Sequence, residues 1–169
     1  HYPLRRQRQM CIRDRDTSAG AGMQADLKTF QELGTYGIVA LTSIVTMDKA
    51  SWSHDVTPIP FDVFEKQLET AISIGPDAVK TGMLGTQEII KRAGEAYVES
   101  GANYFVVDPV MVCKGENEVL NPGNTDAMIE YLLPKATVVT PNLFEAGQLA
   151  NLGTCLLYTS PSPRDKRQS

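Results

Sequence analysis

The sequence of 169 residues has little of what marks several large classes of protein. Its three cysteines are too few, and odd in number, for a disulfide framework, so we expect a reducing compartment, the cytoplasm. It has no run of about 18 apolar residues, so no membrane span is predicted. With a net charge of −4, nothing suggests nucleic acid as a partner. The basic first residues lack the apolar run of a signal peptide.

What remains is ordinary globular composition, 42% hydrophobic and 21% charged, in a length typical of one domain. The basic residues are nevertheless distributed unevenly. Residues 1–15 hold five arginines and residues 154–169 two more, which leaves one of the eight arginines in residues 16–153. We therefore expect residues 16–153 to form the folded part and the flanks 1–15 and 154–169 to be non-native additions. Genuine basic tails for an anionic partner are the alternative.

Within residues 16–153, segments with helical spacing of apolar residues alternate with β-branched apolar runs. Helices are predicted over residues 24–33, 62–73, 86–100, 124–133 and 142–152. Strands are predicted over residues 36–45, 77–80, 103–108 and 136–140, with a loop or short flap over residues 46–60. This alternation predicts an α/β fold with a mostly parallel sheet, in which ligands bind beyond the carboxyl ends of the strands.

The segment 16–26 (DTSAGAGMQAD) places glycines just before a predicted helix. Such a turn exposes backbone N–H groups at the positive end of a helix, which suits an anion or a polar ring substituent. A tight turn without a ligand has the same spacing. A phosphate-binding P-loop is excluded, because no Gly-Lys-Ser/Thr follows.

A second cluster lies beyond two later strands. Asp108 ends one strand, and Asn142 and Glu145 share the first turn of a helix. Two acids and an amide could hold Mg²⁺ together with water and phosphate. Alternatively, Asn142 and Glu145 form a capping box and bind no metal.

Three further positions have chemistry of interest. Lys80 ends a strand, where its charge could meet phosphate, or it is simply a solvated lysine. Cys113 beside Lys114 could be a reactive thiol or a small buried hydrophobe. His54, near Trp52, could cover a flat heterocycle or sit in a surface loop.

Taken together, four motifs resemble the pyridoxal kinase and hydroxymethylpyrimidine kinase group of the ribokinase-like superfamily. They are DTSAGAGMQADLKTF, VKTGMLG, VVDPVMVCKGE and TPNLFEA, and the resemblance spans about residues 16–153. It implies a three-layer α/β sandwich, ATP and Mg²⁺ as cofactors, phosphorylation of a hydroxymethyl group on a vitamin-like ring, and a homodimer at full length. Relative to this group, the first strand and the C-terminal half look missing, so the expected fold is incomplete.

The resemblance also implies roles for individual residues. The substrate-binding set is Asp16, Ser18, Asp26, Val45, Met47, His54, Met83, Val110 and Cys113. The nucleotide and phosphate set is Lys80, Lys114 and Asn142, and the metal set is Asp108 and Glu145. This context favours the metal over the capping box.

The choice of substrate depends on the flap. Pyrimidine kinases of the group usually carry a glutamine where this chain has Met47, and a thioether cannot pair with the amino edge of a pyrimidine. The resemblance places His54 against the pyridoxal ring and lets Cys113 add to the pyridoxal aldehyde. We therefore predict a pyridoxal kinase. The alternatives are a hydroxymethylpyrimidine/phosphomethylpyrimidine kinase and a non-catalytic vitamin-binding protein.

The resemblance places the anion hole and the residue that activates the substrate hydroxyl in the missing C-terminal half. Without them phosphoryl transfer loses its main electrostatic help. We therefore expect the 169-residue chain itself to be catalytically inactive, with no catalytic residue of its own.

Overall fold

The computed structural model describes residues 7–51, 53–111 and 122–150. In these ranges a six-stranded sheet has the order β3-β2-β1-β4-β5-β6, and every neighbouring pair is parallel except β2 with β3. The strands are β1 (Arg8–Asp16), β2 (Tyr36–Met47), β3 (His54–Pro58), β4 (Ala78–Thr81), β5 (Tyr104–Val107) and β6 (Val138–Val139). The helices are α1 (Gly22–Glu32), α2 (Phe61–Ser73), α3 (Gln87–Ser100), α4 (Pro122–Tyr131) and α5 (Leu143–Leu149), and a 3₁₀ turn spans Leu133–Lys135.

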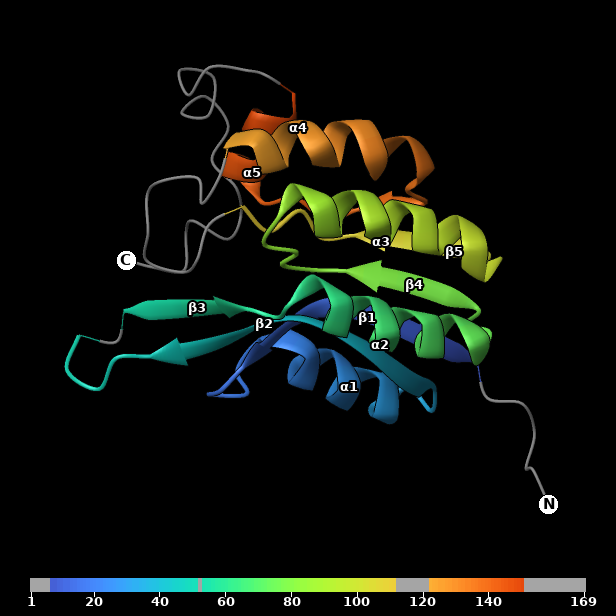
Figure 1. Cartoon of the computed structure of the whole chain (residues 1–169), viewed down its shortest axis with the longest axis horizontal. Coiled ribbons are helices and arrows are strands. Elements are labelled where there is room, and N and C mark those ends of the chain that lie inside the picture. The colour runs from blue at the N-terminus through green and yellow to red at the C-terminus, as the bar shows by residue number, and fades with distance from the viewer. Residues whose placement is uncertain (1–6, 52, 112–121, 151–169) are drawn as a thin grey trace.

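Helices lie on both faces of the sheet (Figure 1). On β2, a Cβ at Gly37 would meet Leu27 and Phe30 of α1, whereas the next residue, Ile38, belongs to the core that also contains Phe64 of α2. Because successive residues of a strand point to opposite faces, α1 and α2 cover opposite sides of β2. The predicted α/β class with a mostly parallel sheet is confirmed.

The main core lies between the sheet and the helices α2, α3 and α4. Phe64 and Leu68 of α2, Ile90 of α3 and Phe105 of β5 are fully buried in it. Phe105 also stacks on Tyr97, with ring centroids 4.5 Å apart. The helices α3 and α4 approach closely at Gly94, where a Cβ would lie 2.6 Å from the carbonyl oxygen of Tyr131.

The exclusion of residues 1–15 from the fold is wrong for residues 8–15, which form most of the central strand β1. Met10, Cys11 and Ile12 have no exposed surface, and β1 pairs with both β2 and β4. The first strand of the fold is therefore present, although its arginines suggested otherwise. Arg13 can lie within this buried strand because the carboxylate of Asp26 on α1 pairs with its charge. The expected flank 154–169 lies outside the described residues.

The segment predicted as a loop or flap contains a regular element. Residues His54–Pro58 form β3, which pairs antiparallel with the end of β2 at the edge of the sheet. The strand is short and has two prolines nearby, so its alternation is too brief to be read from the sequence. Its effect is to project the β2–β3 ribbon beyond the other strands (Figure 1).

Candidate active site

A pocket of about 360 Å³ lies at the carboxyl ends of β1, β2 and β4, a volume within the range of small-molecule sites. Its lining residues are Arg13, Asp14, Asp16, Ser18, Gly20, Ala21, Val45, Met47, His54, Met83 and Val110. Seven of the predicted substrate-binding residues are among them: Asp16, Ser18, Val45, Met47, His54, Met83 and Val110. The fold thus brings together side chains from five separate segments of the chain.

One side of the pocket is the turn between β1 and α1, which Asp16 organises. Its carboxylate accepts hydrogen bonds from the backbone N–H of Ser18 at 2.8 Å, from the Ser18 hydroxyl at 2.8 Å and from the backbone N–H of Ala21 at 2.9 Å. Burial alone raises the pKa of Asp16, but these hydrogen bonds outweigh it and hold the pKa below the usual aspartate value. Asp16 is therefore an ionised anchor of the turn.

Glycine is required where this turn enters α1. Gly22 has a φ of +67°, and a Cβ there would lie 2.6 Å from the backbone nitrogen of Asp16. Both facts exclude a larger residue. The glycines predicted to form a tight turn do so, and the turn lies against the pocket through Gly20 and Ala21.

The opposite side of the pocket is apolar. Val45 and Met83 are buried and form a small cluster with the half-buried Val56 and Val110. At the end of the ribbon, Met47 and His54 are register partners on β2 and β3. These two side chains are therefore neighbours at the rim, where a flat ring could be held between the apolar wall and the imidazole.

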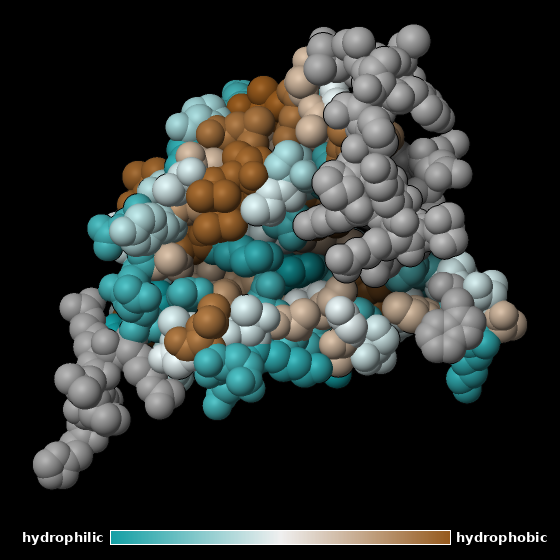
Figure 2. Space-filling view, turned by 180° about the vertical axis from the view of Figure 1, so that it is seen from behind, coloured by the Kyte–Doolittle hydropathy of each residue, from teal (hydrophilic) through white to brown (hydrophobic). Residues whose placement is uncertain are grey.

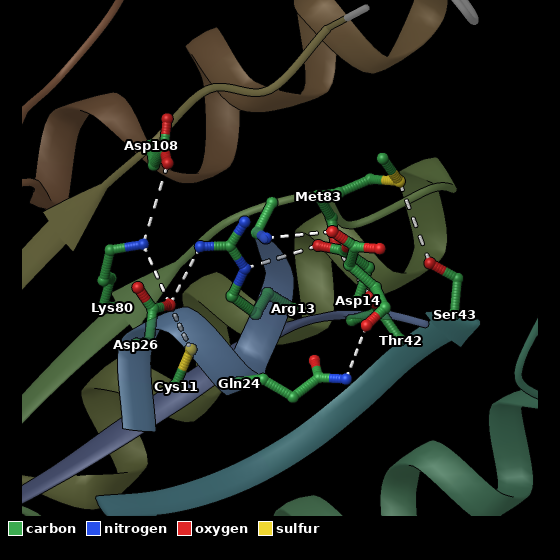
Figure 3. A network of polar contacts seen from close by, with 12 residues as sticks. Cys11, Arg13, Asp14, Gln24, Asp26, Thr42, Ser43, Lys80, Met83 and Asp108 are labelled. Carbon is green, nitrogen blue, oxygen red and sulfur yellow. Dashed lines mark hydrogen bonds and ion pairs between the residues drawn. The ribbon is translucent and has the colours of Figure 1, made fainter. Parts of the chain in front are cut away.

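Behind the pocket lies a network of charges around Asp26 (Figure 3). One oxygen of Asp26, Oδ2, lies 2.9 Å from Arg13 Nη1, 2.9 Å from Cys11 Sγ and 3.2 Å from Lys80 Nζ. Burial raises the pKa of Asp26, but the Cys11 hydrogen bond and the two cations together outweigh burial and lower it. Asp26, predicted to bind the ring, is paired internally and is not among the residues that line the pocket.

Lys80 links this network to the next strand. Its Nζ lies 3.7 Å from Oδ2 of Asp108, at the carboxyl end of β5. The lysine therefore lies between an acid behind the pocket and an acid of the predicted metal set. Lys80 is therefore not the simple solvated lysine of the alternative interpretation, because its side chain is only 23% exposed and has two carboxylate partners.

Of the predicted metal pair, Asp108 follows β5 and Glu145 lies in the first turn of α5. Asn142 and Glu145 form the capping box that was the alternative to a metal, with bonds of 2.8 Å and 2.9 Å. Burial raises the pKa of Glu145, and the nearby charge of Asp108 raises it further. No group of three or more His, Cys, Asp or Glu side chains suited to a metal occurs within the described residues.

Sequence reasoning missed three residues at this site. Arg13 and Asp14 line the pocket, and Cys11 contacts Asp26, yet all three fall in the excluded segment. The apolar run Met10–Ile12 next to Asp16 was a signal that could have found the strand. Of the remaining predicted residues, Cys113 and Lys114 lie outside the described residues, as does Trp52.

Comparison with known proteins places this arrangement in a family. The model of the family described as phosphomethylpyrimidine kinase matches residues 16–156. The chain belongs to the phosphomethylpyrimidine kinase family. Nine of the eleven residues that line the pocket lie within the matched residues, as does the capped acid of α5, whereas Arg13 and Asp14 precede them.

Two curated proteins of one organism are similar to the chain to different degrees. A pyridoxine kinase of Bacillus subtilis is 54% identical over 145 residues, which are 85% of this chain and 54% of that protein. A hydroxymethylpyrimidine/phosphomethylpyrimidine kinase of the same organism is 38% identical over 144 residues, which are 85% of this chain and 53% of that protein. The chain thus spans about half the length of the curated relatives it matches.

A solved structure has the same fold over nearly the whole chain. The pyridoxal kinase of Staphylococcus aureus, in complex with AMP-PCP and pyridoxal, matches with a TM-score of 0.84 and 71% identity. The match covers 96% of this chain and 56% of that one.

Within the described residues, no helix of the chain is long and apolar enough to cross a membrane.

Proposed function

We propose that the protein to which this chain corresponds is an ATP-dependent pyridoxal kinase, which phosphorylates the hydroxymethyl group of pyridoxal. The observation that carries the proposal is the rim of the pocket, where Met47 and His54 are register partners above the apolar wall of Val45 and Met83. The 71% identity to a pyridoxal kinase solved with AMP-PCP and pyridoxal supports it.

On the substrate side, the pocket offers a flat ring an apolar surface and few hydrogen-bonding partners at the ribbon. Met47 has no N–H donor and no strong acceptor, so the amino edge of a pyrimidine would be left unpaired there. His54 can donate to or accept from a ring substituent, and Ser18 presents a hydroxyl at the opposite side. This combination favours a pyridine ring over an aminopyrimidine.

On the phosphate side, the carboxylates of Asp108 and Glu145 supply the negative charge that would suit a Mg²⁺ ion. Glu145 is 6% exposed, and the charge of Asp108 acts on it unfavourably, a repulsion that a divalent cation would relieve. When bound, the ion would neutralise phosphate charge during transfer. Lys80 contacts Asp108 and would hold that carboxylate in place, while Asn142, at the start of α5, would lie beside the nucleotide.

The second candidate is a hydroxymethylpyrimidine/phosphomethylpyrimidine kinase, which the description of the family model and the relative at 38% identity favour. The two candidates differ in the ring that the pocket accepts. Homodimer formation by the whole protein is a prediction common to both.

The proposal is tested by titrating the 169-residue chain with pyridoxal and with hydroxymethylpyrimidine in a calorimeter. We expect pyridoxal to bind more tightly and no phosphorylation of either compound with ATP and Mg²⁺. Met47→Gln should shift the preference toward the pyrimidine, by about tenfold if one hydrogen bond of about 1.4 kcal/mol is gained. Met47→Leu is the matched control, because it is apolar and similar in volume and should leave the preference unchanged.

A kinase assay on a protein extended to the full length of its relatives completes the test. Turnover of pyridoxal above that of the pyrimidine is the expected result. Tighter binding and faster turnover of the pyrimidine would replace the proposal with the second candidate. Binding of neither ring by the chain or by the extended protein would contradict both.

A further inference from the structure

The strand β2 changes its alternation in the middle. From its core end as far as Thr42 every second residue is buried, but Ser43, which follows directly, is buried as well. Between Leu41 and Ile44, two residues of β2 stand opposite a single residue of β1. This two-against-one pairing is a β-bulge, which bends a strand and redirects the side chains that follow it.

The bulge decides which side chains of β2 face the pocket. Gly37 points toward α1 and Ile38 toward α2, and in strict alternation Val45 and Met47 would share the face of Gly37. The extra residue shifts the alternation by one, which returns both side chains to the face of Ile38. There Val45 packs with Met83, and Val45 and Met47 both line the pocket. The apolar wall therefore depends on the bulge.

Both side chains of the bulge contact Met83, the residue of the apolar wall that follows β4. The Thr42 hydroxyl donates to the backbone carbonyl oxygen of Met83 at 2.7 Å, and Oγ of Ser43 lies 3.9 Å from Sδ of Met83 (Figure 3). Thr42 and Ser43 are each only 1% exposed, so water has little access to replace either contact. The bulge and the turn after β4 are thereby joined into one unit.

We propose that Thr42 is a positioning residue of the ring site, whose bond to Met83 fixes the bulge that aims Val45 and Met47 into the pocket. The proposal rests on the proposed function, because pyridoxal is the ring that this wall would contact. Thr42 does not itself line the pocket and acts through the two segments that it joins. If the segments move independently, the wall no longer contacts the ring along its whole face, and binding weakens.

The test is a calorimetric titration of the full 169-residue chain with pyridoxal. Thr42→Val keeps the shape of the side chain without the hydroxyl, and we expect its affinity to fall about five- to tenfold, the contribution of one buried hydrogen bond. Thr42→Ser keeps the hydroxyl and should restore the affinity. Thr81→Val is the matched control, because the fully buried Thr81 of β4 has no hydrogen-bond partner for its hydroxyl within the described residues. Its affinity should not change.

Methyl NMR of the methionine-labelled chain gives a second readout, which needs no ligand. In Thr42→Val the ε-methyl signals of Met47 and Met83 should shift, because the bulge and the turn after β4 are no longer joined. The signal of Met128, which is buried in the main core, should stay in place. A general loss of stability would not select the two methionines of the pocket.

The outcomes separate this proposal from the proposed function. If the unmodified chain binds pyridoxal and Thr42→Val binds it equally well, or Thr81→Val loses as much, the positioning role is refuted and the function stands. If the unmodified chain binds no pyridoxal, the proposed function fails, and unshifted signals of Met47 and Met83 would refute the positioning role as well. Should Thr42→Val not fold, as judged by its melting transition, Ser43→Ala replaces it, with an expected loss of about twofold because the contact to sulfur is weaker.

Discussion

The turn at the start of α1 depends on one carboxylate, and replacing it tests the architecture of the pocket. In Asp16→Asn one oxygen becomes an NH₂ group, which cannot accept the bond from the backbone N–H of Ala21. Leaving that N–H without its partner costs about 1–3 kcal/mol, and the remaining bonds lose their charge assistance, about 1 kcal/mol more. We expect the free energy of unfolding to fall by about 2–4 kcal/mol.

Asp48→Asn is the matched control, because Asp48 makes a similar turn in the exposed ribbon. There a single oxygen, Oδ1, accepts all three bonds, from the backbone N–H groups of Ala50 and Ser51 and from the Ser51 hydroxyl. Asparagine keeps that oxygen, and solvent screens the lost charge. The free energy of unfolding should therefore stay close to that of the unmodified chain.

Urea unfolding followed by circular dichroism measures both variants, and pyridoxal titration of Asp16→Asn shows whether the pocket survives. The pH dependence adds a signature. Because the hydrogen bonds hold the pKa of Asp16 low in the folded chain, its stabilising effect is complete above the unfolded value of about 3.9 and is lost as the pH falls through the folded value. The difference from Asp16→Asn should shrink over that range. Equal losses in the two asparagine variants, or a difference independent of pH, would refute the reasoning.

Two other predictions concern packing and thiol reactivity. Gly94→Ala should lower the free energy of unfolding by about 1–3 kcal/mol despite the better helix propensity of alanine, because its Cβ would meet the backbone of Tyr131 at 2.6 Å. The control Glu95→Ala, on the exposed side of α3, should change the free energy of unfolding by less than about 0.5 kcal/mol. Equal effects of the two variants in denaturant unfolding would contradict the close packing of α3 on α4. Burial, together with the charge of Asp26, raises the pKa of the Cys11 thiol, so iodoacetamide should alkylate Cys11 only after unfolding. Peptide mass spectrometry locates the alkylated cysteine. Rapid alkylation of Cys11 in the native chain at pH 7 would contradict the prediction.

Much of the fold could be predicted from the sequence because the information is local. The amphipathic spacing of α2 and α3 and the β-branched run of β2 are visible within windows of a dozen residues. Thr86 caps the start of α3, and Gly101, in the left-handed conformation, ends it. These elements were predicted to within one or two residues.

The strands β1 and β3 were harder for a different reason. Arg13 and Asp14 interrupt the apolar pattern of β1, and the charge of Arg13 is tolerated only because Asp26, on a helix that follows in the chain, lies beside it. The five residues of β3 are strand because the end of β2 pairs with them. Pairing and charge compensation across the chain leave no periodic signal in a short segment.

The candidate site divides in the same way. The sequence by itself determined which residue types stand at the carboxyl ends of the strands, including the Asp16 turn, the apolar Val45 and Met83, and the capping pair on α5. Only the pairing of β2 with β3 makes Met47 and His54 neighbours, and only the packing of α1 on β1 brings Arg13 to Asp26. Residue identity and local spacing are encoded along the chain, but which side chain fills the space between two others depends on where non-adjacent strands and helices bring them.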